Sequence, residues 1–470
     1  MSRYLPYFLL IALVAAWTLA FQHIPFFWDT VQLGSKHAHH FFENGLAWMP
    51  LPTDIDSGHP PVFGYYLALL WTFFDKTLSV SHWAVFPFFL SMILAAYALG
   101  QQPLRSAWAV ALVFVVWADP VVAGQSTLVS PDLALAAFFL IAVYSFFKNL
   151  KWWSALALFG LCLISMRGAM TAAALLAWQV VEHRNQLKAP SQWLGWALVF
   201  FPGFAAAAAY QLWHYRQTGW IGYHPASPWA PAFQPADVQQ FCKNIAVVAW
   251  RWLDFGRWAE WLLLFALGLH FRNRNHWPPH FKSSAVLSIC LLLLLSPSAL
   301  LYQNLSAHRY FLPLFLALHL CVFYGLMHAD WSSWQKKVLC LGLALSLLTG
   351  NLWIYPRGIS MDWDATLAHL PYHALRSEMM TFIDRSKVPL AEIGTAFPNV
   401  NSGEHLLLDG DTRKFAEIDF EKNQYILASN VYNDFSIENL DRLKADWRLL
   451  QRLEYQGVWL ALYKKPVPKL

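Results

Sequence analysis

Twelve apolar runs limit what this chain can fold into more than any other feature. Each is long enough, or nearly long enough, to cross a bilayer, which takes about 20 helical residues. The runs lie at residues 4–24, 61–74, 83–100, 106–118, 131–147, 152–166, 169–182, 192–213, 257–271, 283–301, 309–327 and 337–353. Charged residues make up 13% of the 470 residues, against about 25% in soluble domains. We therefore predict a mainly α-helical bundle with about eleven or twelve membrane crossings.

The composition and the known short motifs argue against several other functions. The net charge of +5 is modest and falls in loop clusters, which is typical of membrane topology rather than of nucleic-acid binding. Most of the five cysteines lie in apolar runs, so we predict neither a disulfide framework nor a cysteine metal cluster. The sequence contains no phosphate-binding loop, dinucleotide glycine pattern or serine-nucleophile elbow. A soluble nucleotide-dependent mechanism therefore has no support.

Lysine and arginine in the connections predict the orientation. From residue 101 onward, ten fall on one side and six on the other, and the richer side is expected to be cytoplasmic. The outer side then holds Asp132, the loop 214–256 and the C-terminal region. Arg3 and Arg105 fit this arrangement only if one apolar run between them does not cross. We expect the run 61–74 to lie along the membrane surface or to re-enter; the alternative is that Arg105 is misleading as a marker of the cytoplasmic side.

The last part of the chain differs from the rest because its charge is dense and its apolar runs are short. Residues 425–428 and 458–462 read as strands, and residues 436–450 read as a helix capped by Ser436. We therefore predict two domains. Residues 1–356 form the transmembrane domain, with outer loops at 25–60 and 214–256, and residues 357–470 form a small extracytoplasmic α/β domain.

Two carboxylates on the predicted outer side are candidates for catalysis. Asp29 follows the first apolar run, and an ionised group at the membrane edge is costly unless it faces water or a partner. It could act as a general base, or it could be a helix cap or interfacial anchor. Asp132 follows Pro131 at the start of another run, which is also ordinary helix-start chemistry. Two outward carboxylates could line one pocket.

The first outer loop carries further polar candidates. His37 and His40 are three residues apart and would share a face of a helix, as would His39 and Glu43. Such spacing could bind a metal, although no third ligand is identifiable, or could belong to a plain interfacial helix. The remaining candidates in this loop, which could contact substrate, a phosphate or a cation or could serve only as solubilising loop residues, are Asp54, Asp56 and His59.

Two arginines lie on the outer side against the positive-inside trend. Arg167 stands between two apolar runs, and Arg309 opens another run in the order Arg309-Tyr310-Phe311. A guanidinium group matches phosphate oxygens with two parallel hydrogen bonds, so binding of a lipid phosphate would explain the exception. The alternative is that both side chains extend to the lipid headgroups.

In their order and spacing these residues resemble the bacterial polytopic glycosyltransferases of the GT-C fold. That group includes the protein O-mannosyltransferases and the lipid A aminoarabinose transferases, related to glycosyltransferase family 39. The resemblance covers most of the chain. Relatives often carry a second acidic residue where Thr30 stands, and lysine where His59 and Arg167 stand. The residues that carry the resemblance are Asp29, His59-Pro60-Pro61, Pro131-Asp132, Arg167-Gly168 and Arg309-Tyr310-Phe311-Leu312-Pro313.

The resemblance implies a function. Such an enzyme transfers a sugar from a polyprenyl-phosphate donor to a hydroxyl of a glycolipid, glycan or protein, at the outer face of the bacterial inner membrane. Asp29 would take the acceptor proton in an inverting reaction, and Asp132 would orient the donor or a cation. Arg309 and Arg167, with His59, would hold the lipid phosphate. No cofactor is required, a divalent cation is left open, and the expected partners are the donor, the bilayer and the acceptor, without nucleic acid.

Two other classes of function make different predictions. A transporter or flippase of lipid-linked sugars predicts charges near mid-membrane and broken helices in two related halves, and no such halves are visible in the sequence. A membrane scaffold that only presents the C-terminal domain predicts that Asp29, Asp132 and Arg309 lie scattered. The distance between these three side chains therefore separates a scaffold from an enzyme.

Overall fold

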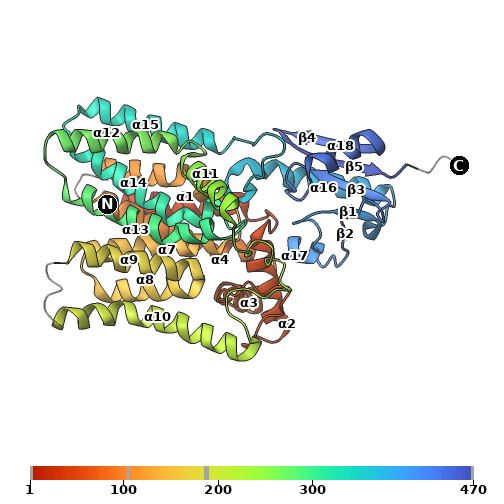
Figure 1. Cartoon of the computed structure of the whole chain (residues 1–470), viewed down its shortest axis with the longest axis horizontal. Helices are drawn as coiled ribbons and strands as arrows, with labels where there is room; N and C mark the ends of the chain where they lie inside the picture. The colour runs from red at the N-terminus through yellow and green to blue at the C-terminus, as the bar shows by residue number, and fades with distance from the viewer. Residues whose placement is uncertain (1–3, 103–105, 185–189, 467–470) are drawn as a thin grey trace.

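Each of the twelve apolar runs forms a helix. The computed structural model describes residues 4–102, 106–184 and 190–466. The helices that correspond to the runs are α1 (Leu5–Phe21), α3 (Val62–Phe74), α4 (Leu78–Gly100), α5 (Ser106–Ala118), α7 (Pro131–Phe147), α8 (Lys151–Ile164), α9 (Met166–Glu182), α10 (Pro190–Thr218), α12 (Trp258–Asn273), α13 (Pro279–Leu301), α14 (Leu312–His328) and α15 (Ser333–Gly350). The predicted fold class, a helical bundle with a small C-terminal sheet domain, is confirmed (Figure 1).

Helix length separates complete spans from shorter helices. Within the described residues, 4 helices are long and apolar enough to cross a membrane, or up to 5 if α5 and α6 (Pro120–Ser126), which bend by 74°, count as one span. The apolar helices α1, α3, α7 and α8 are shorter. Short helices cross only where the bilayer is thin. The eleven or twelve crossings therefore stay a prediction.

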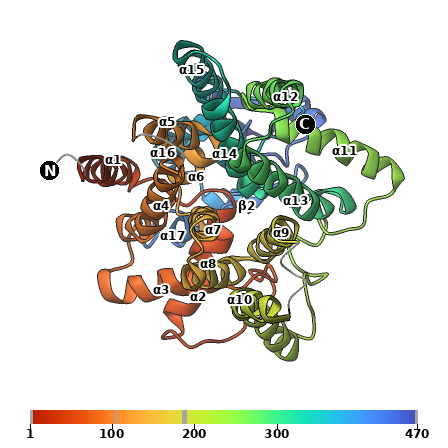
Figure 2. The same cartoon turned by 90° about the vertical axis from the view of Figure 1, so that its left-hand side faces the viewer.

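Helix α14 forms the centre of the bundle (Figure 2). Within the stretch His308–His328, 94% of the apolar segment is buried inside the protein. Helix α14 packs against α5, α7, α12 and α13. A helix that is apolar on all sides is stable only when other elements surround it. The surrounding helices therefore fix the position of the start of α14. The short helix η2 (His308–Phe311) leads into it and is also largely buried.

Helix α3 runs across the bundle. It is seen nearly end-on in Figure 1, where most long helices lie along the horizontal axis, and it lies crosswise in Figure 2. That the run 61–74 lies along the membrane surface or re-enters stays a prediction. Arg3 and Arg105, on which that prediction depends, lie outside the described residues.

The two predicted outer loops contain further helices. The first loop forms η1 (Val31–Lys36) and α2 (His37–Glu43), and α2 packs against α3. The second contains α11 (Val238–Leu253), which the apolar runs did not reveal because only one of its faces is apolar. Asp237 caps α11 by accepting a 2.7 Å hydrogen bond from the backbone of Gln240.

The C-terminal region forms a five-stranded sheet in the order β2-β1-β3-β5-β4. The parallel pairs are β1 with β2 and with β3, and the antiparallel pairs are β5 with β3 and with β4. Its elements are η3 (Trp363–Ala365), η4 (Leu367–His369), α16 (Leu370–Arg385), η5 (Leu390–Glu392), β1 (Ile393–Thr395), α17 (Gly403–Leu407), β2 (Ala416–Glu417), β3 (Tyr425–Ser429), α18 (Ile437–Asp446), β4 (Arg448–Tyr455) and β5 (Val458–Lys464).

The predicted strand, helix and strand correspond to β3, α18 and β5. Ser436 caps α18 as predicted and accepts a hydrogen bond from the backbone of Asn439. The predicted end of this helix at residue 450 is wrong, because Trp447 is already extended and β4 begins at Arg448. Pairing with β5 along the whole of β4 outweighs the helical spacing of the apolar residues. The domain boundary at 356/357 stays a prediction.

The sheet domain is fastened to the first outer loop. The backbone of Phe26 donates a 2.9 Å hydrogen bond to the carbonyl of Leu406. Glu404 forms an ion pair with Lys76 and lies 3.0 Å from His39 Nε2. These contacts join residues more than 300 positions apart and place α17 against the loop that carries Asp29 (Figure 1).

Candidate active site

Four predicted residues meet where the bundle faces the sheet domain. Arg309 forms an ion pair with Asp29, and its Nη1 lies 3.8 Å from Asp132 Oδ2. Arg167 Nη1 lies 2.9 Å from Asp132 Oδ1. Both guanidinium groups lie near the ring of Tyr310, at 4.5 Å for Arg167 and 5.2 Å for Arg309. The scaffold alternative predicted scattered side chains, and this cluster does not fit it.

A tight turn after α1 places Asp29. The Oγ1 of Thr30 accepts a 2.8 Å hydrogen bond from the backbone of Phe27 and donates another to its carbonyl. Trp28 adopts a positive φ of 50°, which reverses the chain and costs backbone energy for a bulky residue. The position that often carries a second acid in relatives here holds the turn together.

The N-terminal ends of α7 and α9 position the side chains of Asp132 and Arg167. The hydroxyl of Ser130 accepts a 3.1 Å hydrogen bond from the backbone of Asp132, so α7 presents this carboxylate in its first turn. The hydroxyl of Ser165 caps α9 by accepting a 3.2 Å hydrogen bond from the backbone of Gly168, and the half-buried Arg167 lies within this first turn. The two interpretations of Asp132, as a residue of the site and as an ordinary helix-start residue, are therefore compatible, because the start of the helix is what positions the carboxylate.

A third carboxylate joins the cluster from the linker, which we define as residues 354–366. Asp364 Oδ2 lies 3.1 Å from Arg309 Nη1. Sequence reasoning missed Asp364, because it stands in a short polar stretch between the two predicted domains and returns to the bundle only in the folded chain. A single guanidinium group thus faces three carboxylates, those of Asp29, Asp132 and Asp364.

Solvent exposure distinguishes the three carboxylates. The side chain of Asp29 is 22% exposed, whereas those of Asp132 and Asp364 are 3% and 4% exposed. Only Asp29 can therefore meet a group that arrives from solvent without a rearrangement of the buried side chains.

Burial raises the pKa of Asp364 to about 7, although Arg309 opposes the shift, and the charges of Asp29, Asp362 and Asp132 add to it. In the unfolded chain this group titrates near 3.8. Between these values the folded state binds a proton that the unfolded state does not, so stability falls as the pH rises through that window.

Asp364→Asn is therefore expected to flatten the dependence of stability on pH. The wild-type contribution amounts to at most about 1.4 kcal/mol per pH unit, and the amide cannot ionise. The measurement is the midpoint of thermal unfolding in detergent from pH 5 to pH 8, with the exposed Asp384 changed to Asn as a control. Parallel profiles for wild type and Asp364→Asn would contradict the buried titration.

Helix α6 supports the linker. The side chain of Gln125 donates a 2.8 Å hydrogen bond to the carbonyl of Asp364, and Thr127 Oγ1 lies 3.1 Å from His369 Nε2. Gly124 allows this close approach, since a Cβ there would lie 2.7 Å from the backbone nitrogen of Thr366. The position of Asp364 therefore depends on a glycine on the opposite helix.

Gly124→Ala should push the linker away from α6. Overpacking of this kind typically costs about 1–3 kcal/mol, which would lower the unfolding temperature and weaken the contact between Asp364 and Arg309. The matched control is Gly342→Ala, also within a helix, where a Cβ would meet nothing within 4 Å. Equal unfolding temperatures for the two variants would show that the linker is not clamped.

His59 lies beside the cluster. It lines a small cavity together with His37, Asp132 and Arg167. Burial lowers the pKa of His59 to about 3, and the nearby charge of Arg167 adds to the effect. Its Nδ1 is buried without a hydrogen-bond partner among the described residues. A neutral imidazole can still donate or accept one hydrogen bond.

Among the other candidates of the first loop, His37 shares that small cavity, and none of them forms an ion pair with Arg167 or Arg309 within the described residues. Asp56 is buried, with His214 Nε2 2.8 Å from one carboxylate oxygen and the backbone of Gly58 donating to the other. His37 lies 2.8 Å from the carbonyl of Ile55, and burial lowers its pKa to about 4. His40 is half-buried, and the exposed side chains are those of Glu43 and Asp54.

The described residues contain no group of three His, Cys, Asp or Glu side chains arranged to hold a metal ion. His37 and His40 therefore have no third protein ligand in the described part of the chain.

Comparison with known proteins supports the fold. No family model and no curated protein matches the sequence. Two solved structures of ArnT from Cupriavidus metallidurans match almost the whole chain. The structure bound to undecaprenyl phosphate has a TM-score of 0.52 and 11% identity over 97% of both chains, and the apo structure has 0.55 and 12% over 98% of both. The chain thus has the GT-C glycosyltransferase-like fold that its motifs predict.

Proposed function

We propose that this protein transfers a sugar from a polyprenyl-phosphate donor to a hydroxyl acceptor at the outer face of the membrane. One observation supports this most strongly. Carboxylates and guanidinium groups from distant parts of the chain gather in one cluster at the end of the bundle, under the sheet domain. The matching fold includes an ArnT structure that is bound to undecaprenyl phosphate.

The cluster suggests that Arg309 exchanges its ion-pair partner, from Asp29 to the phosphate of the donor, when the donor binds. Arg309 is now paired with Asp29, and a donor phosphate would compete for the same guanidinium group. Asp29 would then be released to accept a proton. The acceptor oxygen forms a bond to the anomeric carbon as the bond from that carbon to the phosphate oxygen breaks, and the acceptor proton passes to Asp29.

Charge develops on the leaving phosphate in this step. Arg309 and Arg167 would hold that charge in a site with little water, where one lost contact typically costs about 3–4 kcal/mol. Asp132 would orient Arg167, to which it is bonded at 2.9 Å. His59 would supply a neutral hydrogen bond at the edge of the site.

The decisive experiment supplies the purified protein with a panel of polyprenyl-phosphate sugars. Release of the free lipid phosphate, together with the appearance of a glycosylated acceptor, would support transfer. Movement of the intact lipid-linked sugar across vesicle membranes without cleavage would instead support a transporter and overturn the proposal.

A further inference from the structure

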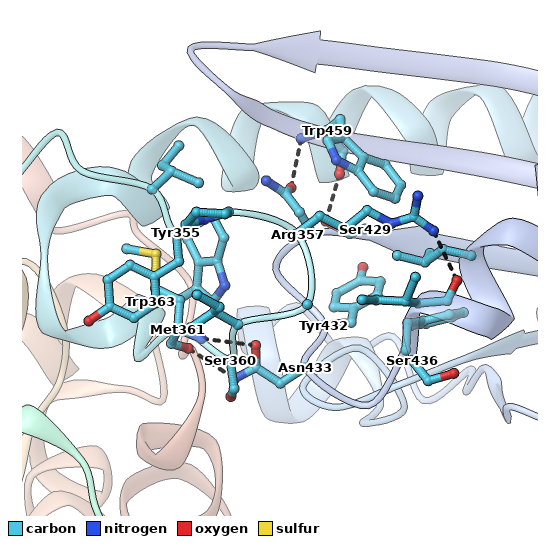
Figure 3. Close-up of a pocket in the computed structure, with 18 of the residues that line it drawn as sticks. Tyr355, Arg357, Ser360, Met361, Trp363, Ser429, Tyr432, Asn433, Ser436 and Trp459 are labelled. Atoms are coloured by element: carbon cyan, nitrogen blue, oxygen red, sulfur yellow. Dashed lines mark hydrogen bonds between the residues drawn. The ribbon is translucent and has the colours of Figure 1, made fainter. Parts of the chain in front are cut away.

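A cavity of about 580 Å³ lies between the linker and the sheet domain (Figure 3). Its volume is in the range of small-molecule sites. One wall is the linker from Ile354 to Trp363, and the other wall is made by β3, α18 and β5. The proposed transfer site, on the opposite side of the linker, does not use this cavity.

The cavity is lined by aromatic rings and polar groups together. Trp459 is half-buried, and the guanidinium group of Arg452 lies 4.9 Å from its ring centre. Trp363 is 1% exposed, and its indole nitrogen is buried with no hydrogen-bond partner among the described residues.

The charges along the lining are mostly positive. The lining includes three cations, Arg357, Lys444 and Arg452, and one carboxylate, Glu438. Arg357 is bound to Asp441 at 2.7 Å and Arg452 to Glu454 at 2.8 Å. Lys444 forms no ion pair with any residue in the described ranges, so its charge is available to an anion.

Close packing holds the cavity open in one shape. Gly358 and Gly457 both have positive φ, and a Cβ at either position would lie 2.5 Å from Ile437 or 2.9 Å from Ile354. Asn433 donates a 2.9 Å hydrogen bond to the carbonyl of Met361. The linker is thus fixed to the sheet domain on both sides of the cavity. Because the walls are already ordered, less conformational entropy is lost when a ligand binds.

We propose that this cavity binds an anionic saccharide. A sugar ring offers an apolar face to an indole and hydroxyl groups to polar neighbours, and a phosphate or carboxylate on the ring would pair with Lys444. A purely apolar ligand would leave the ammonium group of Lys444 without a partner. A free inorganic anion would not use the aromatic walls.

The linker connects this cavity to the transfer site. Along it the side chains alternate: Met361 and Trp363 line the cavity, whereas Asp362 and Asp364 contact the bundle. Asp362 accepts a 2.8 Å hydrogen bond from the backbone of His308, and Asp364 pairs with Arg309. If the proposed function holds, the saccharide in the cavity belongs to the acceptor.

The test is binding of glucose 6-phosphate to the full chain in detergent, followed by saturation-transfer NMR of the ring protons. We expect Trp459→Ala to weaken binding about tenfold and Lys444→Ala about three- to tenfold, where tenfold corresponds to about 1.4 kcal/mol. Arg442→Ala, on the same helix as Lys444 but outside the lining, is the matched control and should bind as wild type does.

Three results would overturn the proposal: unchanged affinity in both cavity variants, glucose that binds as tightly as glucose 6-phosphate, or inorganic phosphate that binds as tightly as the sugar phosphate. Lys444 is exposed, so its variant remains informative if Trp459→Ala unfolds. The binding assay requires no transfer. Its failure would therefore leave the proposed function standing, and a failed transfer assay would not affect the binding result.

Discussion

Asp29→Asn is expected to lower the rate of sugar transfer by about 10²–10⁴-fold, the usual contribution of a general base. The amide keeps the size of the side chain and can still accept a hydrogen bond from Arg309, so we expect the protein to express and fold. Donor binding should change little, because Arg309 remains available to the phosphate. The measurement is the turnover number for lipid phosphate release with acceptor present.

Asp330→Asn is the matched control for this variant. It breaks an ion pair with Arg274 in which both side chains are more than half exposed, and such surface pairs contribute about 0–1 kcal/mol. We expect its activity to equal that of the wild type. Near-normal turnover in Asp29→Asn would rule out Asp29 as the base, even if the protein proved to be a transferase.

Arg309→Ala is expected to have the largest effect on folding. Removing the guanidinium group leaves Asp364 buried without its cation, whereas Asp132 keeps its ion pair with Arg167. Breaking a buried pair in this way costs about 3–5 kcal/mol. Unfolding should therefore occur at a clearly lower temperature in detergent. Arg274→Ala, which removes an exposed arginine, should leave the unfolding temperature unchanged.

Arg309→Lys separates folding from chemistry at the same position. Lysine keeps the charge but cannot form two parallel hydrogen bonds with a phosphate. We expect this variant to fold and to lose about 10²–10³-fold in turnover, as when one donor to a developing oxyanion is removed. Wild-type turnover in Arg309→Lys would mean that the guanidinium group serves packing alone.

The helices of the bundle could be predicted because each buries a long apolar run, and this signal is local. Ser436 likewise predicted the start of α18 correctly, since a helix cap involves residues only three apart. The end of that helix was not predictable in the same way. Trp447 continues the helical spacing, yet the pairing of β4 with β5 ends the helix one residue earlier.

The candidate site could be predicted only in part. Asp29, Asp132 and Arg309 stand out because a charge beside an apolar run needs a reason to be there. Asp364 does not stand beside an apolar run in the sequence. It reaches Arg309 only because Gly124 lets the linker approach α6 and Gln125 binds its carbonyl, and both contacts join residues more than 200 positions apart.

Because α17 is bonded to the first outer loop, the bundle and the sheet domain are not expected to work as separate fragments. Arg309 is fixed from within the bundle, but Asp29 stands on a turn whose neighbour Phe26 is bonded to Leu406. A chain shortened to its first 356 residues would retain the cation and lose both Asp364 and this brace. The C-terminal part thus contributes a carboxylate and a brace to the proposed site, and we expect that the two parts cannot be exchanged as independent modules.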